Sequence, residues 1–269
     1  MRVVVIANQK GGCGKTTTAV NLSACLGTQG KRVLLVDLDP QSHATIALTD
    51  PEATAASGVA ELLSGDAARE DAVRPAAYNL DMLGSSPAVD DLEGQLAADP
   101  ARWLALVRLV KDLSRDYDLA VLDCPPNTGP LTRAALAASD FLLLPVETSY
   151  FALYGVGRML RLVREEEARR GSALPYGVLL TLFDRRTTHA REILKQLREH
   201  FGRSLFATVV SVNVSLREAA SHGRPITEYR RRSKGYQHYL ELSTELMLAL
   251  DGLADRETVL ASGGKQWMN

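Results

Sequence analysis

Residues 3–17 read VVVIANQKGGCGKTT, an apolar run followed by a glycine-rich turn and the start of a further segment. The run from Val3 to Ala7 is short, continuous and mostly β-branched, which is typical of a strand buried on both faces of a parallel sheet. From about Thr16 the apolar residues recur at helical spacing, and Gly27 and Gly30 predict the end of that helix. A buried strand, a turn and a helix therefore open the chain.

The same alternation continues along the chain. A second buried strand is expected at residues 33–37, which completes a strand–turn–helix–strand unit. Further strands are expected at residues 119–123, 141–146, 176–181 and 206–210, and helices at residues 153–170, 189–200 and 236–250. This pattern predicts an α/β fold with a doubly wound, mostly parallel sheet and helices on both faces.

The glycine-rich turn has the composition that phosphate binding requires. Glycines let backbone N–H groups crowd around phosphate oxygens without a Cβ in the way. A lysine supplies a point charge, a hydroxyl binds Mg²⁺, and the N-terminus of the following helix favours an anion. Gly14-Lys15-Thr16 completes the G-x-x-x-x-G-K-[ST] pattern of P-loop NTPases, although Gln9 replaces its first glycine and a second lysine, Lys10, enters the loop.

Two of the expected strands end in carboxylates. The segment Asp37-Leu38-Asp39-Pro40-Gln41 places two carboxylates at the carboxyl end of a strand, where open α/β sheets bind ligands. Asp123 ends another apolar run, a Walker B pattern whose carboxylate holds Mg²⁺ through water. A structural turn at residues 37–41 and a helix N-cap at Asp123 are the alternatives, but the P-loop upstream favours the functional interpretation.

Several motifs together resemble one known family. The loop K-G-G-x-G-K-T-T at residues 10–17 resembles the deviant Walker A motif of the ParA/MinD ATPases, which are related to the nitrogenase iron protein. The segment D-x-D-P-Q at residues 37–41 resembles switch I of that family, and D-x-P-P at residues 123–126 resembles its switch II. Residues 180–187, 221–226 and 233–235 are similar to the chromosomal ParA, or Soj-like, branch, so the likeness covers nearly the whole chain.

The resemblance implies a homodimer that encloses two ATP molecules with Mg²⁺. It implies catalytic roles for Asp39, which is associated with the attacking water, and for Lys10, which reaches the nucleotide of the partner subunit. Thr181 ends a strand at a position where the family contacts adenine. The implied phosphate-binding residues are Gly11, Gly12, Cys13, Gly14, Lys15, Thr16 and Thr17. The implied metal-binding residues are Thr16, Asp39 and Asp123.

The bulk properties set limits on the domain organisation. With 269 residues, of which 46% are hydrophobic, the chain suits one α/β domain with a sizeable core. Residues 45–115 fit the alternation poorly, apart from an expected strand at residues 80–83 and a helix around residues 101–113. We interpret this part as an insertion within a single P-loop ATPase domain spanning residues 1–260, followed by a flexible tail at residues 261–269.

Composition also argues against several functions. The formal net charge of −1 creates no global attraction to nucleic acid, so DNA binding requires a local basic patch. Cys13, Cys25 and Cys124 form no C-x-x-C pair, which disfavours a disulfide framework and an iron–sulfur cluster. No apolar stretch approaches 18 residues, so we expect no membrane span and a cytoplasmic location. A redox role for Cys13 at a helix N-terminus is an open alternative.

Whether the dimer binds DNA or membrane depends on the C-terminal half. The expected DNA-binding residues are Arg186, Arg217, Arg230, Arg231, Arg232 and Lys234. A merely solvated basic face is the alternative, because the Soj-like branch commonly has P-R-N-V-R where this chain has Val212 and Ser215 in place of both arginines. A MinD-like membrane helix would be basic and amphipathic, whereas residues 236–250 contain no lysine or arginine.

The motifs and the family resemblance together predict an ATP-dependent dimerising ATPase that partitions or positions a cargo. In its ATP state it is expected to bind duplex DNA without sequence preference. A ParB-like protein would stimulate hydrolysis, and DNA binding would place the protein on the nucleoid. The alternatives are a small-molecule ligase or kinase of the same fold, of the dethiobiotin-synthetase or amidoligase kind, and a MinD-like membrane-associated positioning ATPase. Lys10 and the D-P-Q segment favour the first interpretation.

Overall fold

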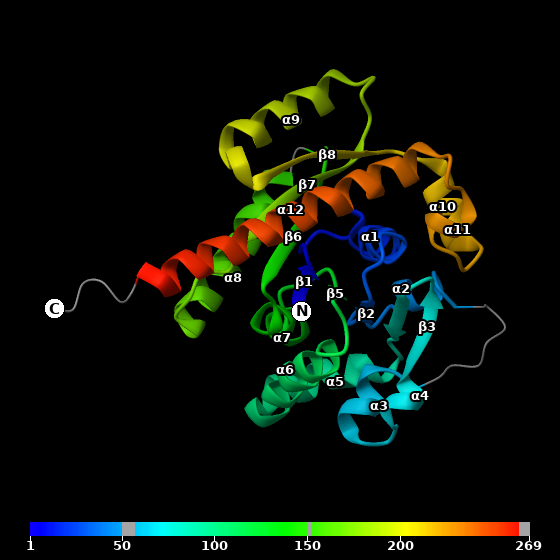
Figure 1. The fold of residues 1–269 in the computed structure, drawn as a ribbon, viewed down its shortest axis with the longest axis vertical. Helices are drawn as coiled ribbons and strands as arrows, with labels where there is room; N and C mark the ends of the chain where they lie inside the picture. Colours follow the sequence, from blue (N-terminus) through cyan, green and yellow to red (C-terminus); the bar gives the residue numbers. More distant parts are fainter. Residues whose placement is uncertain (50–56, 150–151, 264–269) are drawn as a thin grey trace.

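The computed structural model describes residues 1–49, 57–149 and 152–263, and its centre is one eight-stranded sheet. The strand order is β3-β4-β2-β5-β1-β6-β7-β8, and every neighbouring pair is parallel except β3 and β4 (Figure 1). The order reverses at β1, with β5 and β2 on one side and β6 and β7 on the other. The predicted doubly wound α/β fold is therefore confirmed.

The strands are β1 (Arg2–Ile6), β2 (Val33–Asp37), β3 (Val73–Ala77), β4 (Leu80–Leu83), β5 (Leu119–Asp123), β6 (Phe141–Glu147), β7 (Tyr176–Phe183) and β8 (Leu205–Ser211). The helices of the amino-terminal half are α1 (Lys15–Thr28), α2 (His43–Ile46), α3 (Val59–Ser64), α4 (Arg69–Ala72), α5 (Ala88–Ala98), α6 (Pro100–Ser114) and α7 (Pro130–Ala138). Those that follow are α8 (Ala152–Arg170), α9 (Thr188–Phe201), the 3₁₀ turn η1 (Gly202–Ser204), α10 (Val214–Ser221), α11 (Ile226–Tyr229) and α12 (Lys234–Gly263).

Two hydrophobic cores cover the two faces of the sheet. Val3 and Val5 of β1 point into the core shared with α3 and α5 to α9, whereas Val4 and Ile6 point into the core shared with α1, α2 and α10 to α12. Successive side chains of a strand point to opposite faces, so a strand covered on both sides is apolar throughout. For this reason the central strands could be recognised in the sequence as continuous apolar runs.

The amino-terminal helix ends between the two glycines that were expected to end it. α1 passes through Gly27 and ends at Thr28, with Gly30 just beyond it at a positive φ of 85°. A Cβ at Gly27 would collide with the backbone carbonyl of Tyr78 in the turn between β3 and β4. Gly27 thus allows this close approach of the turn and does not end the helix.

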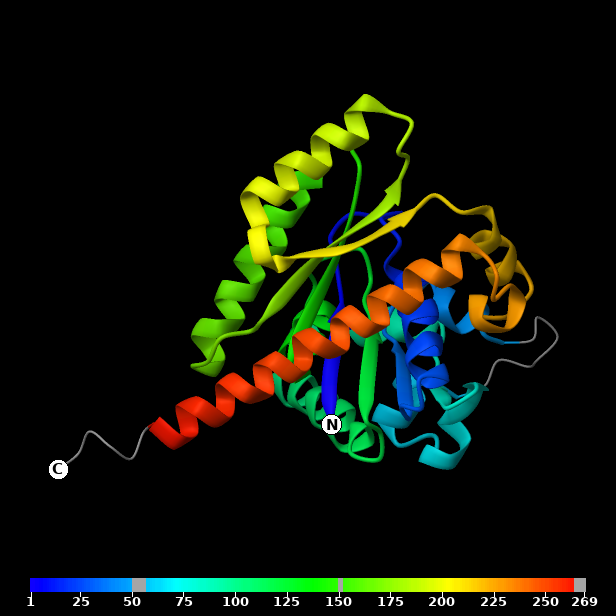
Figure 2. The ribbon, with the colours of Figure 1, turned by 45° about the horizontal axis from the view of Figure 1, so that its top comes forward.

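The edge of the sheet and the carboxyl-terminal helix also differ from the sequence-based expectation. β3 was not predicted, because it is a half-exposed edge strand that contains Pro75. α12 extends well beyond residues 236–250 and crosses the sheet beside α1 (Figure 2). The first residues of the predicted flexible tail are helical in α12, and residues 264–269 lie outside the described residues. Within the described part of the chain, no helix has the length and hydropathy needed to cross a membrane.

Candidate active site

The register of the central strands brings the predicted site residues together. Ile6 at the end of β1 pairs with Asp123 at the end of β5, and Asp123 pairs in turn with Asp37 at the end of β2. The loop after β1 and the two carboxylates therefore leave the sheet at the same level. This is the carboxyl edge at the point where the strand order reverses, where open α/β sheets bind ligands.

The loop between β1 and α1 is already folded around a lysine. Gly12 and Gly14 have φ angles of 74° and 85°, in the left-handed region that favours glycine. The Lys15 side chain is buried, and its Nζ donates a hydrogen bond to the backbone carbonyl of Lys10 at 3.1 Å. The loop thus circles the ammonium group at the N-terminus of α1, an arrangement suited to binding phosphate.

Thr181 supports this loop from β7. Its hydroxyl is buried and donates a hydrogen bond to the backbone carbonyl of Cys13 at 2.7 Å. A cavity of about 320 Å³ lies beside it, lined by residues that include Thr17, Leu182 and Val212. Leu182 has a φ of 51°, a strained conformation that tends to occur at functional sites. The adenine contact expected of Thr181 stays a prediction.

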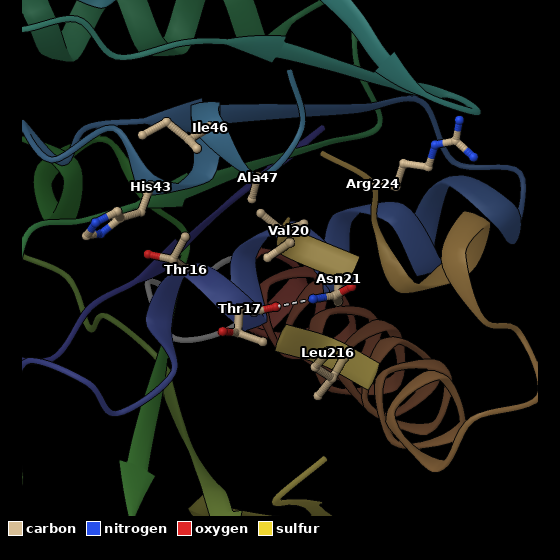
Figure 3. A pocket seen from close by; sticks show the side chains of 10 residues that line it. Thr16, Thr17, Val20, Asn21, His43, Ile46, Ala47, Leu216 and Arg224 are labelled. Carbon is tan, nitrogen blue, oxygen red and sulfur yellow. Dashed lines mark hydrogen bonds between the residues drawn. The ribbon is translucent and has the colours of Figure 1, made fainter. Parts of the chain in front are cut away.

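A second cavity lies on the other side of the first turn of α1 (Figure 3). It has a volume of about 330 Å³, and its lining includes Thr16 and Thr17 of α1, His43 and Ile46 of α2, and Arg224. Leu216 and Thr17 line both cavities. Both cavities therefore border the first turn of α1, directly after the phosphate loop.

Lys10 is held within its own chain. Its ammonium forms an ion pair with Glu147 and donates a hydrogen bond to the Ser149 hydroxyl at 2.6 Å. Its backbone N–H donates to Asn8 Oδ1 at 3.1 Å, and the Asn8 amide donates to the Pro145 carbonyl. The ion pair is partly exposed, so breaking it costs little. Sequence reasoning missed Glu147 and Ser149, because no motif marks the end of β6.

Asp37 holds the backbone of switch I (residues 37–41) and of α2. Its Oδ2 accepts hydrogen bonds from the backbone N–H and the hydroxyl of Thr45, at 2.8 and 2.7 Å, and its Oδ1 accepts one from the Asp39 N–H at 3.1 Å. Burial raises the pKa of Asp37 to about 6, partly opposed by the hydrogen bonds from Thr45. Thr45 was not predicted, although it follows switch I closely.

Asp39 is buried but keeps one oxygen free. Its Oδ1 accepts a hydrogen bond from the Gln41 N–H at 3.0 Å. Its backbone carbonyl accepts two, from the Ser42 N–H and from the Ser85 hydroxyl, each at 2.8 Å. Within the described residues, Oδ2 has no hydrogen-bond partner. That oxygen can accept a hydrogen bond from a water molecule.

Asp123 is fully buried, and neither carboxylate oxygen has a hydrogen-bond partner in the described part of the chain. Burial raises its pKa well above the usual range, and the neighbouring Asp37 adds to the rise, while Thr16 and Lys15 oppose it. An unpartnered buried carboxylate next to a threonine hydroxyl fits a hard cation.

Residues 1–49, 57–149 and 152–263 contain no group of three or more His, Cys, Asp or Glu that could hold a metal by themselves.

The cysteines near the loop lack the features of reactive thiols. Cys13 and Cys124 are buried, and their burial raises the pKa of both thiols. The Cys13 Sγ donates to the Lys10 carbonyl at 3.2 Å. A protonated, buried thiol is a poor nucleophile and a poor redox sensor, so the geometry favours a packing role for Cys13.

The basic residues predicted to bind DNA are exposed, and several bond within the chain. Arg186, in the turn after β7, forms a two-pronged interaction with Asp184, with distances of 2.9 and 2.7 Å. Arg231 donates to the Thr227 carbonyl at 2.6 Å, and Arg230 lies 3.9 Å from Glu218. Arg217 lines the cavity beside Thr181, while no side-chain hydrogen bond or ion pair is found for Arg232 and Lys234 among the described residues. The basic surface is thus only partly available.

Comparisons with known proteins agree with this geometry. Residues 1–174 match the sequence profile of a family described as an AAA domain. The chromosome-partitioning ATPase Soj of Thermus thermophilus is 43% identical over 251 residues, which cover 92% of this chain and 96% of that protein. The sporulation initiation inhibitor protein Soj of Bacillus subtilis is 40% identical over 247 residues, covering 91% and 98%.

A solved structure shares both the fold and part of the sequence. It is described as cobyrinic acid a,c-diamide synthase from Mycobacterium smegmatis with bound ATP analog and magnesium. It superposes with a TM-score of 0.78 at 33% identity, over 92% of this chain and 94% of that chain. The extent of similarity to the Soj proteins, together with the deviant phosphate loop, shows that the chain belongs to the ParA/MinD family of P-loop ATPases, in its Soj-like branch.

Proposed function

We propose that this chain is an ATP-dependent dimerising ATPase that partitions or positions a cargo such as DNA. One observation carries the proposal: Asp39 Oδ2, which has no hydrogen-bond partner among the described residues, lies at the same edge of the sheet as a pre-formed phosphate loop. The names of the Soj relatives, one of which is a chromosome-partitioning ATPase, support the same activity. In this proposal residues 1–260 act as one ATPase domain, and residues 261–269 as a tail.

ATP binds with its phosphates against the loop of residues 10–17. Lys15 and the backbone N–H groups of the loop hold the β- and γ-phosphates, and Thr181 supports the loop next to the base. Thr16, Asp123 and Asp39 would hold Mg²⁺, which neutralises charge on the phosphate oxygens when bound. The M. smegmatis structure, with its ATP analog and magnesium, supports this ligand pair.

Asp39 orients the water that attacks the γ-phosphate, using the oxygen that has no partner in the described part of the chain. Lys10 acts from a second subunit: it leaves Glu147 and Ser149 and reaches the nucleotide of its partner. A positive charge supplied in trans to a transferring phosphoryl group contributes on the order of 10³–10⁵ in rate. Dimerisation and catalysis are thereby coupled through one lysine.

The ATP dimer binds duplex DNA without sequence preference, through Arg186, Arg217 and the segment from Arg230 to Lys234. The support is the exposure of these residues, in the turn after β7 and from α10 to the start of α12, together with the Soj relatives' names. A ParB-like protein stimulates hydrolysis. Location on the nucleoid in the cytoplasm follows from this binding.

A filter-binding titration of the Asp39→Ala protein with ATP, on unrelated duplexes, tests the function. A dimer that makes about four phosphate contacts gives a slope near −3.6 for log K against log salt, or a loss of about 150-fold between roughly 50 and 200 mM salt. Absence of binding even at low salt would show that the replacements at Val212 and Ser215 remove the DNA surface, and the DNA-partitioning proposal would fall.

A small-molecule amidoligase is the second candidate function. It is favoured by the description of the M. smegmatis structure as cobyrinic acid a,c-diamide synthase, at 33% identity. The two functions differ in what stimulates steady-state ATP turnover. A small carboxylic acid would raise the turnover of a ligase, whereas DNA and a protein partner would raise that of a partitioning ATPase.

A further inference from the structure

The loop between β4 and α5 contacts switch I directly and, through Thr45, the adjoining helix α2. The Ser85 hydroxyl donates a hydrogen bond to the backbone carbonyl of Asp39 at 2.8 Å. The Ser85 N–H donates to the Thr45 hydroxyl at 2.8 Å, and that hydroxyl in turn donates to Asp37 Oδ2 at 2.7 Å. A chain of hydrogen bonds therefore runs from the β4–α5 loop to both aspartates of switch I.

The hydrogen bond between Ser85 and the Asp39 carbonyl is buried, whereas those of Thr45 are partly buried. Asp37, Asp39 and Ser85 are 0%, 5% and 7% exposed. The loop approaches so closely because residue 84 is glycine: a Cβ there would lie 3.2 Å from the Thr45 methyl group. A buried hydrogen bond leaves an unsatisfied partner when one member is removed, so its loss is felt more than that of an exposed one.

The Asp39 carbonyl is one of the points that join switch I to the rest of the protein; the Leu38 N–H, which donates to the Asp123 carbonyl at 2.9 Å, is another. The other hydrogen bond of the Asp39 carbonyl, from the Ser42 N–H, is local, and Ser42 has a left-handed φ of 53° directly after the turn at Pro40. Ser85 is 46 residues away from Asp39 in the sequence. Among the described residues, no other side chain outside switch I and α2 hydrogen-bonds to Asp39. The Asp39 main chain thus receives a hydrogen bond from the hydroxyl of a distant loop.

We propose that Ser85 is a positioning residue, which orients the Asp39 carboxylate through the main-chain carbonyl of Asp39. The proposal rests on the proposed function, in which Asp39 orients the attacking water. Displacement of a catalytic group by about 1 Å can cost on the order of 100-fold in rate. A single hydroxyl far from the phosphates can therefore influence hydrolysis without touching ATP.

The neighbouring serine provides a matched control. Ser86 is 8% exposed, and its hydroxyl donates to Glu61 Oε1 at 2.8 Å instead of to switch I. Glu61 Oε2 in turn accepts a hydrogen bond from the Gly58 N–H at 2.9 Å. Ser85 and Ser86 therefore lie in the same loop, are similarly buried and make hydrogen bonds of the same length. They differ in the partner, which is switch I for Ser85 and Glu61 for Ser86.

The first test measures single-turnover hydrolysis of saturating ATP with Mg²⁺ by Ser85→Ala and Ser86→Ala. We expect the rate to fall about tenfold in Ser85→Ala and by less than about twofold in Ser86→Ala, with the Kd for ATP unchanged in both. Ser85→Thr, which keeps the hydroxyl, should recover most of the rate. Equal rates in the two alanine variants, or a weakened ATP Kd in Ser85→Ala, would overturn the positioning role.

Two further measurements separate positioning from simple stabilisation. In an Asp39→Ala background, Ser85→Ala should change the residual rate by less than about twofold, because no carboxylate is left to orient. A full tenfold loss in that background would overturn the proposal. Hydrogen exchange at residues 39–45 should be faster in Ser85→Ala than in Ser86→Ala. Hydrogen exchange does not depend on ATP hydrolysis. It therefore tests whether Ser85 holds switch I even if the wild-type protein does not hydrolyse ATP and the proposed function is wrong.

Discussion

Two aspartates, Asp37 at the carboxyl edge of the sheet and Asp184 in the turn after β7, have their pKa values displaced in opposite directions. Asp37 is fully buried, and loss of hydration raises its pKa to about 6. Asp184 faces solvent, and the Arg186 guanidinium lowers its pKa to about 2. The first belongs to the nucleotide site and the second to the basic surface.

The difference shows how strongly the function of each region depends on any single residue. At the buried edge the effective dielectric constant is low and each polar group has few partners, so one substitution has a large effect. On the exposed surface, water and salt screen each charge, and binding comes from the number of contacts. We therefore expect ATP chemistry to depend on single residues and DNA binding to depend on the sum of several.

The largest effect is expected at the buried lysine of the loop. Lys15→Ala should weaken ATP binding on the order of 100-fold or more, since a charged hydrogen-bond donor is lost from a pre-formed anion site. Isothermal titration with ATP and Mg²⁺ measures it. Lys111→Ala, on an exposed position of α6, is the control and should bind like wild type. Wild-type affinity in Lys15→Ala would refute the P-loop assignment.

The second lysine of the loop should affect assembly instead of ATP affinity. Lys10→Ala should bind ATP and stay monomeric, because its proposed partner is the nucleotide of another subunit. Asp39→Ala should bind ATP, hydrolyse it on the order of 100-fold more slowly and persist as a dimer. Size-exclusion chromatography with ATP compares the two variants. If Lys10→Ala dimerised as well as wild type, the role in trans would be wrong.

The buried carboxylate should make the nucleotide-free protein less stable as pH rises. Because the folded pKa of Asp37 lies above its usual value of 3.8, the folded state binds more protons than the unfolded state between about pH 4 and 6. The free energy of unfolding therefore falls as pH rises across this window, and Asp37 contributes about 3 kcal/mol to the fall.

Calorimetry without nucleotide or Mg²⁺ tests this at pH 4.5 and 7. Asp37→Asn should lose less stability than wild type between the two values, because an amide does not ionise. An equal or larger loss in the variant would contradict the assignment.

The smallest effect is expected on the exposed surface. Asp184→Asn should free Arg186 for a phosphate contact and strengthen DNA binding by a few-fold, about 2–5 times at low salt. The matched control is Asp112→Asn, which removes an equal charge from an exposed pair with Arg115 on α6. Filter binding on one duplex compares them. Equal gains in both variants would mean that net charge alone matters.

Much of the fold and the site could be predicted because their signals are local. The central strands are continuous apolar runs, and the loop, switch I and Asp123 lie within short motifs at strand ends. The β3 edge strand, half exposed and interrupted by Pro75, carried no such signal. The prediction that Gly27 ends α1 was wrong, because Gly27 instead leaves room for the backbone around Tyr78 to pack against the helix.

The residues that escaped prediction contact the site across long distances in sequence. Ser149 meets Lys10 across 139 residues, and Ser85 meets Asp39 across 46. Serine and threonine are common in any chain, so neither type nor spacing singles these out. Their roles depend on which loops the sheet brings side by side.

The amino-acid sequence alone thus specified the chemistry: a phosphate loop with two lysines, carboxylates at strand ends and a parallel α/β sheet. Each of these features is made by residues that are contiguous in the sequence, and its backbone conformation depends on those residues alone. The state of each group depended on the folded chain. Burial raises the pKa of Asp37, a neighbouring arginine lowers that of Asp184, Lys10 pairs with Glu147, and Ser85 holds Asp39. Hydration and long-range hydrogen bonding exist only once distant segments meet, and no local motif encodes them.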